Sequence, residues 1–108
     1  MSQLSGIYHH VYLWLREDGE PGDAHTVSEA AHKFLADIPG VLSVLVAAPA
    51  GPTLPAVDSS YSLVLLLEFT DVAIIESYET HPQHVAFVEA CKPLFSRVQV
   101  YNSAPFVA

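Results

Sequence analysis

Two apolar segments that lack a polar face constrain the fold of this chain most. Residues 7–15 and 61–69 are rich in aromatic and branched side chains, which is typical of β-strands. A strand whose sheet has one face in water alternates apolar and polar residues. Neither segment alternates, so we expect both faces of the sheet that they build to be covered by other parts of the protein.

A first helix is expected between these two strands. Thr26 and Glu29 have the spacing of a capping box, in which the two side chains pair with backbone N–H groups at the start of a helix. Pro39 and Gly40 would end that helix. Helical spacing places four apolar residues on the face that should be buried, namely Val27, Ala31, Phe34 and Ile38.

The remaining segments complete a regular order of elements. Strands are predicted at residues 41–48 and 96–103, and helices at 71–79 and 82–92. The resulting order, β-α-β-β-α-β, predicts an α+β, ferredoxin-like fold with a four-stranded antiparallel sheet and helices on one face. We expect a single domain over residues 1–108.

The second face of the sheet needs a cover that the predicted elements do not supply. The simplest cover is a second copy of the chain, packed sheet against sheet as a two-fold homodimer, which is the commonest kind of oligomer. The proline-rich segment 48–60 joins two strands as a long loop. Whether this loop acts as a lid stays open from the sequence.

The charge composition argues against several partners. Net charge is −8, and the only basic residues are Arg16, Lys33, Lys92 and Arg97. Binding of nucleic acid requires many Lys and Arg side chains, so neither nucleic acid nor an anionic membrane is an expected partner. No segment approaches the roughly 20 apolar residues of a membrane span. The first residues lack the pattern of a signal peptide, and we expect a cytoplasmic protein.

A proline fixes the phase of the last helix. Pro82 suits the first helical position, which makes His81 the expected cap and puts His84 in the first turn. From His84, apolar residues follow at helical spacing at Phe87, Val88 and Cys91. His84 is therefore expected to point inward, where burial and the helix N-terminus keep its ring neutral, the state of a general base.

Alternation along the first strand separates two histidines. His10, Tyr12 and Trp14 share one face, which we expect to meet the helices and to line one cavity with His84. His9 would then point to the opposite face, toward the dimer interface. A cavity with aromatic walls and two histidines would suit a neutral, flat or polyketide-like ligand. A filled aromatic core without a cavity is the alternative.

Neither a metal nor another cofactor is expected. His81 and His84 form a helical pair without a suitably spaced third ligand, and the adjacent His9 and His10 face opposite ways. Cys91 is the only cysteine, which excludes an intrachain disulfide and a multi-cysteine metal site. We expect Cys91 to be a small buried hydrophobe.

Four segments together resemble the stress-responsive A/B-barrel (Dabb) family of dimeric α+β barrels. They are Tyr-His-His-Val-Tyr-Leu-Trp at 8–14, Ile-Pro-Gly-Val at 38–41, residues 61–69 and Tyr-Glu-Thr-His-Pro-Gln-His-Val-Ala-Phe at 78–87. The last is the most specific. The resemblance covers about residues 7–102 and implies a dimeric barrel built from ferredoxin-like copies.

One branch of the family, the plant polyketide cyclases, implies a site. By that resemblance His84 is the base, Tyr78 assists it, and His10 is a further catalytic histidine. Leu63 stands where that branch has another pocket histidine, which argues against the same substrate. The residues expected to bind substrate are Tyr12, Trp14, Phe34, Leu63, Phe87, Val88 and Cys91.

Three functions remain open from the sequence. The first is a cofactor-free cyclase, isomerase or lyase that acts on a small hydrophobic carbonyl compound with His84 as the base. The second is a non-catalytic, stable dimeric barrel that binds a hydrophobic metabolite or serves in a stress response. A weaker third is a cofactor-independent monooxygenase. In the non-catalytic case His84 and Tyr78 are structural, with their polar atoms hydrogen-bonded inside the fold.

Overall fold

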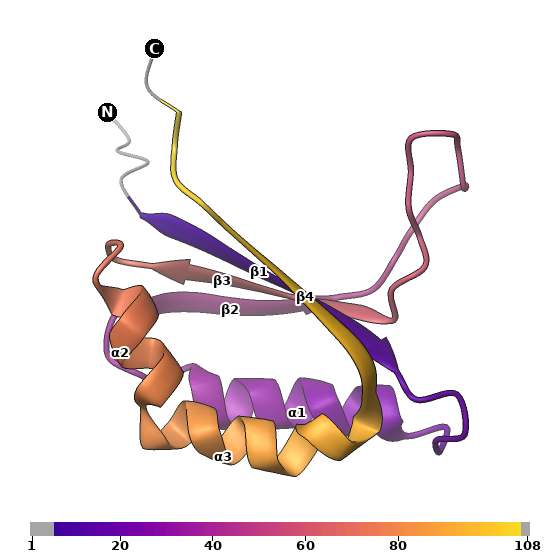
Figure 1. The fold of residues 1–108 in the computed structure, drawn as a ribbon, viewed down its shortest axis with the longest axis horizontal. Coiled ribbons are helices and arrows are strands. Elements are labelled where there is room, and N and C mark those ends of the chain that lie inside the picture. The colour runs from indigo at the N-terminus through magenta and orange to yellow at the C-terminus, as the bar shows by residue number, and fades with distance from the viewer. Residues whose placement is uncertain (1–5, 107–108) are drawn as a thin grey trace.

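The computed structural model of the protein describes residues 6–106 and has the predicted order of elements (Figure 1). Its strands and helices are β1 (Ile7–Leu15), α1 (Asp23–Leu35), β2 (Val41–Ala47), β3 (Leu63–Phe69), α2 (Ile74–Thr80), α3 (Pro82–Cys91), a 3-10 turn η1 (Lys92–Leu94) and β4 (Phe95–Ser103). The strands form one antiparallel sheet in the order β2-β3-β1-β4. The α+β, ferredoxin-like fold is confirmed.

The helices lie together on one face of the sheet and leave the other face open (Figure 1). The core forms between the helices and the covered face. Its fully buried members include Leu13, Leu65 and Phe69 from the sheet, Val27, Ala31 and Leu35 from α1, and Cys91 from α3. Among residues 6–106, no helix is long and apolar enough to cross a membrane.

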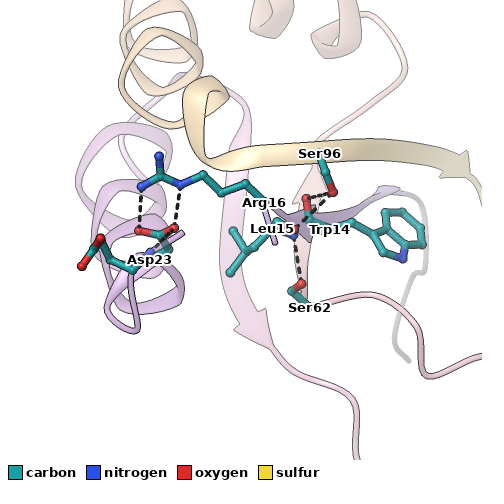
Figure 2. A network of polar contacts seen from close by, with 7 residues as sticks. Trp14, Leu15, Arg16, Asp23, Ser62 and Ser96 are labelled. Atoms are coloured by element: carbon teal, nitrogen blue, oxygen red, sulfur yellow. Dashed lines mark hydrogen bonds and ion pairs between the residues drawn. The ribbon is translucent and has the colours of Figure 1, made fainter. Parts of the chain in front are cut away.

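Helix α1 begins at Asp23, ahead of the capping box predicted at Thr26 and Glu29, so that prediction is wrong. The Asp23 carboxylate accepts hydrogen bonds from Arg16 Nε at 3.0 Å and from the backbone N–H of Glu20 at 3.2 Å (Figure 2). The Arg16 guanidinium holds the pKa of Asp23 below its usual range. A carboxylate in the first turn also interacts favourably with the helix dipole. This ion pair thus sets the start of α1.

The register of β1 corrects the predicted assignment of its faces. Leu13 pairs with Leu63, and both belong to the buried core between the sheet and the helices. His9 lies on the same face and is 4% exposed. His10 and Tyr12 therefore point to the open face, which is the reverse of the prediction. The covered face of β1 thus carries Ile7, Val11 and Leu13 beside His9, whereas Tyr12 and Trp14 lie on the open face.

The long loop between β2 and β3 projects beyond the sheet (Figure 1). Its last residues are fixed to β1, because Trp14 Nε1 donates a hydrogen bond to Ser60 Oγ at 3.1 Å and Ser62 Oγ accepts one from the Leu15 backbone at 3.0 Å. On the other side of β1, Ser96 Oγ donates hydrogen bonds to the backbone oxygens of Trp14 and Leu15 (Figure 2). The loop is thus anchored beside the open face and not over the helices.

The turn before β2 requires glycine. Gly40 has φ +92° and packs against Ile74, so that a Cβ atom at Gly40 would lie 2.6 Å from Ile74 Cγ1. We expect Gly40→Ala to lower the free energy of unfolding by about 2–4 kcal/mol, because it combines left-handed strain with overpacking. Chemical denaturation at fixed protein concentration measures this loss.

Gly51→Ala is the matched control. Gly51 also has a positive φ, +83°, but no atom lies within 4 Å of an added Cβ. Its substitution should cost only about 1 kcal/mol, from strain alone. Equal losses in the two variants would show that contact with Ile74 does not matter.

Candidate active site between the helices and the sheet

The break between α2 and α3 positions the candidate base. A residue before proline avoids helical backbone, and His81 is accordingly extended, with φ −65° and ψ 136°. His81 Nδ1 accepts a hydrogen bond from the backbone N–H of Gln83 at 3.0 Å. His81 is therefore the N-cap of α3 and Pro82 lies in the first turn, as predicted.

His84 is tied back to the end of α2. Its Nδ1 lies 3.1 Å from the backbone oxygen of Glu79. Because a carbonyl oxygen only accepts hydrogen bonds, Nδ1 carries the proton, and in the neutral ring Nε2 holds the lone pair. Nε2 also lies 3.7 Å from the Glu79 carboxylate. That distance is too long for a hydrogen bond, but it lets the carboxylate stabilise an imidazolium once one forms.

Tyr78 packs directly against this histidine. Its ring centroid lies 4.5 Å from that of His84 and 4.9 Å from that of Phe69, and the residue is 2% exposed. Burial raises the pKa of Tyr78, so its hydroxyl stays protonated. This hydroxyl has no hydrogen-bond partner among residues 6–106, yet none of their buried polar side-chain atoms is unsatisfied. Tyr78 also lines the cavity between α2, α3 and the sheet, where its hydroxyl can donate to a ligand.

His9 completes the cluster, although it was expected on the opposite face of the sheet, toward the dimer interface. His9 Nδ1 lies 2.6 Å from Asn102 Oδ1 and is the donor to that oxygen, which leaves Nε2 as an acceptor. The ring stacks on Phe69 at 5.0 Å and meets Tyr78 edge-on at 5.3 Å. Burial lowers the pKa of His9, and the neighbouring His84 acts in the same direction. His9 is therefore held neutral beside the candidate base.

These side chains line a cavity of about 300 Å³ between α2, α3 and the sheet. Its polar lining residues are His9, Tyr78, Glu79, His84 and Lys92. Most of the remaining wall is aliphatic or aromatic and comes from β1, β3, β4 and α3. Such a mostly apolar cavity with a few convergent polar groups is the usual form of a small-molecule site.

The predicted substrate-binding residues divide among several places. Phe87 and Val88 line the cavity. Leu63 and Cys91 belong to the buried core but not to the cavity wall, and burial raises the pKa of the Cys91 thiol. Phe34 lies away from the cavity, on a part of α1 where its ring is 5.1 Å from Lys33 Nζ. The expectation that Phe34, Leu63 and Cys91 share a wall with His84 is thus corrected.

The other predicted residues of β1 gather on the open face. His10, Tyr12 and Trp14 line a second hollow of about 380 Å³, which the loop residue Asp58 also borders. The Arg97 guanidinium lies 4.2 Å from the Trp14 ring there. The sheet separates this hollow from His84, so these three residues do not share a cavity with it, contrary to the prediction.

The histidines serve separate places and do not gather around a metal. No group of three or more His, Cys, Asp and Glu residues within the described part of the chain could hold a metal ion. His81 caps α3, while His9 and His10 point to opposite faces of the sheet.

The neutral state of His9 predicts a pH dependence of stability. Its pKa is lowered in the folded protein, so as the pH falls the unfolded chain binds this proton first. The stability linked to His9 is therefore full above a pH of about 6.5 and is lost below it. We expect stability to fall less from about pH 7.5 to about pH 5.5 in His9→Gln than in the wild type.

Denaturant titrations at the two pH values measure this difference. His32→Gln is the control, because His32 is exposed on α1 and should leave the pH dependence as it is in the wild type. An unchanged pH dependence in His9→Gln would contradict the assignment of a neutral, buried His9.

Several solved structures have the same fold as this chain. A Dabb family protein from Mesorhizobium loti, with a ferredoxin-like fold, is 25% identical, with a TM-score of 0.77 over 95% of this chain and 99% of that one. A dimeric ferredoxin-like protein of unknown function from Thermobifida fusca is 20% identical (TM-score 0.75; coverage 95% and 93%). A hydroxynitrile lyase from Passiflora edulis is 12% identical (TM-score 0.81; coverage 98% and 98%).

The sequence itself identifies the family. No curated protein matches the chain significantly. The family model of the stress responsive A/B barrel domain, however, matches residues 7–104, and the sheet order and helical layer described above agree with the ferredoxin-like fold of the Mesorhizobium loti protein. The chain therefore belongs to the stress responsive A/B barrel domain (Dabb) family.

Proposed function

We propose that this chain is a lyase, isomerase or cyclase that acts without a cofactor and uses His84 as its general base. The observation that supports this most is the pairing of two groups on one cavity wall: His84 with Nε2 free, and Tyr78 with an unpaired hydroxyl. The apolar surroundings favour a small hydrophobic carbonyl compound as the substrate.

The geometry supports a simple proton-transfer mechanism. His84 Nε2 takes a proton from the carbon next to the carbonyl group, and the C–H electron pair moves into an enolate. The Tyr78 hydroxyl donates a hydrogen bond to the enolate oxygen, where the negative charge develops. The Glu79 carboxylate, 3.7 Å from Nε2, stabilises the imidazolium until it returns the proton to the product.

We assign the role that the family resemblance gave to His10 to His9 instead. His9 lies on the cavity side of β1, whereas His10 lies on the open face. Asn102 fixes the ring of His9, so its Nε2 can accept a hydrogen bond from a hydroxyl group of the substrate. Because His9 is neutral, it does not oppose formation of the imidazolium at His84.

The hydroxynitrile lyase of Passiflora edulis gives this proposal chemical support, since its fold is the same. Release of cyanide from a hydroxynitrile begins with removal of a hydroxyl proton, which is also work for a general base. A lyase reaction is therefore as compatible with the His84 site as proton removal from carbon is.

A second function uses the same cavity without catalysis. A mostly apolar cavity of about 300 Å³ can bind a hydrophobic metabolite in a stable barrel, with His84 and Tyr78 serving only as hydrogen-bonding groups. The two functions differ in what the loss of the His84 imidazole should do, because binding would largely persist while proton transfer would not.

We expect His84→Ala to slow proton transfer by about 10²–10⁴-fold, the usual contribution of a general base. The assay follows exchange of α-hydrogen for deuterium in small aromatic ketones in D₂O by NMR, together with cleavage of aromatic cyanohydrins. Circular dichroism verifies that the variant is folded.

His81→Asn is the matched control for that substitution. Asn keeps the N-cap of α3 and removes a histidine that lies outside the proposed chemistry. It should exchange deuterium at the wild-type rate. Equal rates in His84→Ala and the wild type, with ligand binding intact, would favour the non-catalytic function.

We further propose that the open face of the sheet meets a second copy of the chain. On that face Leu45 of β2 is 57% exposed and Tyr101 of β4 is 58% exposed. They lie on the two outer strands, on either side of β1 and β3. Large exposed apolar groups on a sheet face are typical of an interface between subunits. The Thermobifida fusca protein, which shares the fold, is described as dimeric.

We expect the wild type to have twice the chain mass of 11.7 kDa in light scattering at micromolar concentration. Tyr101→Glu should shift the protein toward the monomer, because it places a charge in the proposed interface. Val72→Glu is the control, since Val72 is 66% exposed before α2 and lies off the sheet. A monomeric wild type would exclude the proposed interface.

A further inference from the structure

We propose that Lys92 selects ligands that have an apolar body and an anionic end, and that it orients them with the uncharged end at His84. The inference deepens the proposed function, because it concerns the same cavity. It rests on the placement of charge around that cavity.

Lys92 and His84 mark two ends of one wall. Together with Val88 they follow each other at intervals of four residues, and all three line the cavity. Residues four apart are neighbours on a helix surface. Lys92 keeps helical backbone angles, φ −52° and ψ −40°, at the end of α3. Eight residues of helix place its Cα about 12 Å beyond that of His84 along the axis.

Lys92 is also the one cationic residue on the wall, in a chain of net charge −8 with four basic residues. The other three are engaged elsewhere: Arg16 pairs with Asp23, Lys33 lies over Phe34, and Arg97 stacks on Trp14. Within residues 6–106 Lys92 forms no ion pair. Its ammonium group is therefore available to a ligand.

The opposite charge lies at the other end of the cavity. The Glu79 carboxylate, with 57% of its side chain exposed, stands beside His84 Nε2. A ligand carboxylate would be repelled there and attracted to Lys92, so the two charges act together to orient it. Between them the wall is mostly apolar, with Phe87, Val88 and Phe95 among its members.

These features together define a class of ligand. Its anionic group, a carboxylate in the simplest case, binds near Lys92, and an aliphatic or flat apolar body fills the cavity. The reacting carbonyl or hydroxyl group then lies at the far end, beside His84 and Tyr78. Oxo- or hydroxy-substituted medium-chain carboxylic acids have this arrangement.

The test compares octanoate with its uncharged amide, octanamide, as probes of the cavity. Binding to the intact protein is measured from amide chemical shifts in ¹⁵N-labelled samples. We expect octanoate to bind about fivefold more tightly than octanamide in the wild type, as for an exposed ion pair, and added salt to reduce the difference. Lys92→Met should no longer prefer octanoate, because the attracting charge is gone while Glu79 remains.

Lys33→Met is the matched control, because it removes the same charge from a site away from the cavity. It should keep the preference for octanoate. Equal binding of the two probes to the wild type, an unchanged preference in Lys92→Met, or no binding of octanoate at millimolar concentration would each overturn the inference.

The same experiment separates this inference from the proposed catalysis. His84→Ala should still prefer octanoate, because the selecting charge is at Lys92. If the preference depends on Lys92 but proton transfer does not depend on His84, the ligand class stands and the catalytic function fails. If proton transfer depends on His84 but Lys92→Met keeps the preference, the reverse holds.

Discussion

The peptide bond between His81 and Pro82 is the constraint on which the candidate site depends. Proline disfavours helical backbone at the residue before it, so α2 ends and α3 starts in a new direction. The last turn of α2 leaves backbone oxygens without hydrogen-bond partners inside the helix. His84 Nδ1 donates to one of these, the backbone oxygen of Glu79. The break that ends one helix thus fixes the ring of the histidine in the next. Tyr78, in the last turns of α2, is brought against that ring by the same bend.

The residues of the site that could be predicted are those whose orientation follows from signals in the neighbouring sequence. Pro82 marks the first turn of α3, so helical spacing alone placed His84, Phe87 and Val88 on one side, and all three line the cavity. The order of elements and the antiparallel sheet were predictable for a similar reason. Long apolar segments of characteristic period, separated by proline and glycine, leave few arrangements open to so short a chain.

The parts that could not be predicted depend on contacts between distant segments. Both faces of β1 are rich in apolar groups, so alternation showed that His9 and His10 are on opposite faces but not which face meets the helices. The pairing of β1 with β3 and the helical layer decide this. The start of α1 is similar: Arg16, outside the helix, holds Asp23 and lengthens α1 beyond its local capping signal. Cys91 shows that a residue on the same helix face as His84 can serve the core rather than the cavity.

Strand β1 separates the cavity beside the helices from the hollow on the open face. Its backbone carries His9 into the cavity beside His84 and the adjacent His10 into the hollow on the other side. In a two-fold assembly through the open face, each copy would keep all of its cavity-lining side chains to itself. The two sites would then have no shared wall through which occupancy of one could alter the other. An interface variant that separates the copies would therefore leave the set of cavity-lining residues in each chain complete.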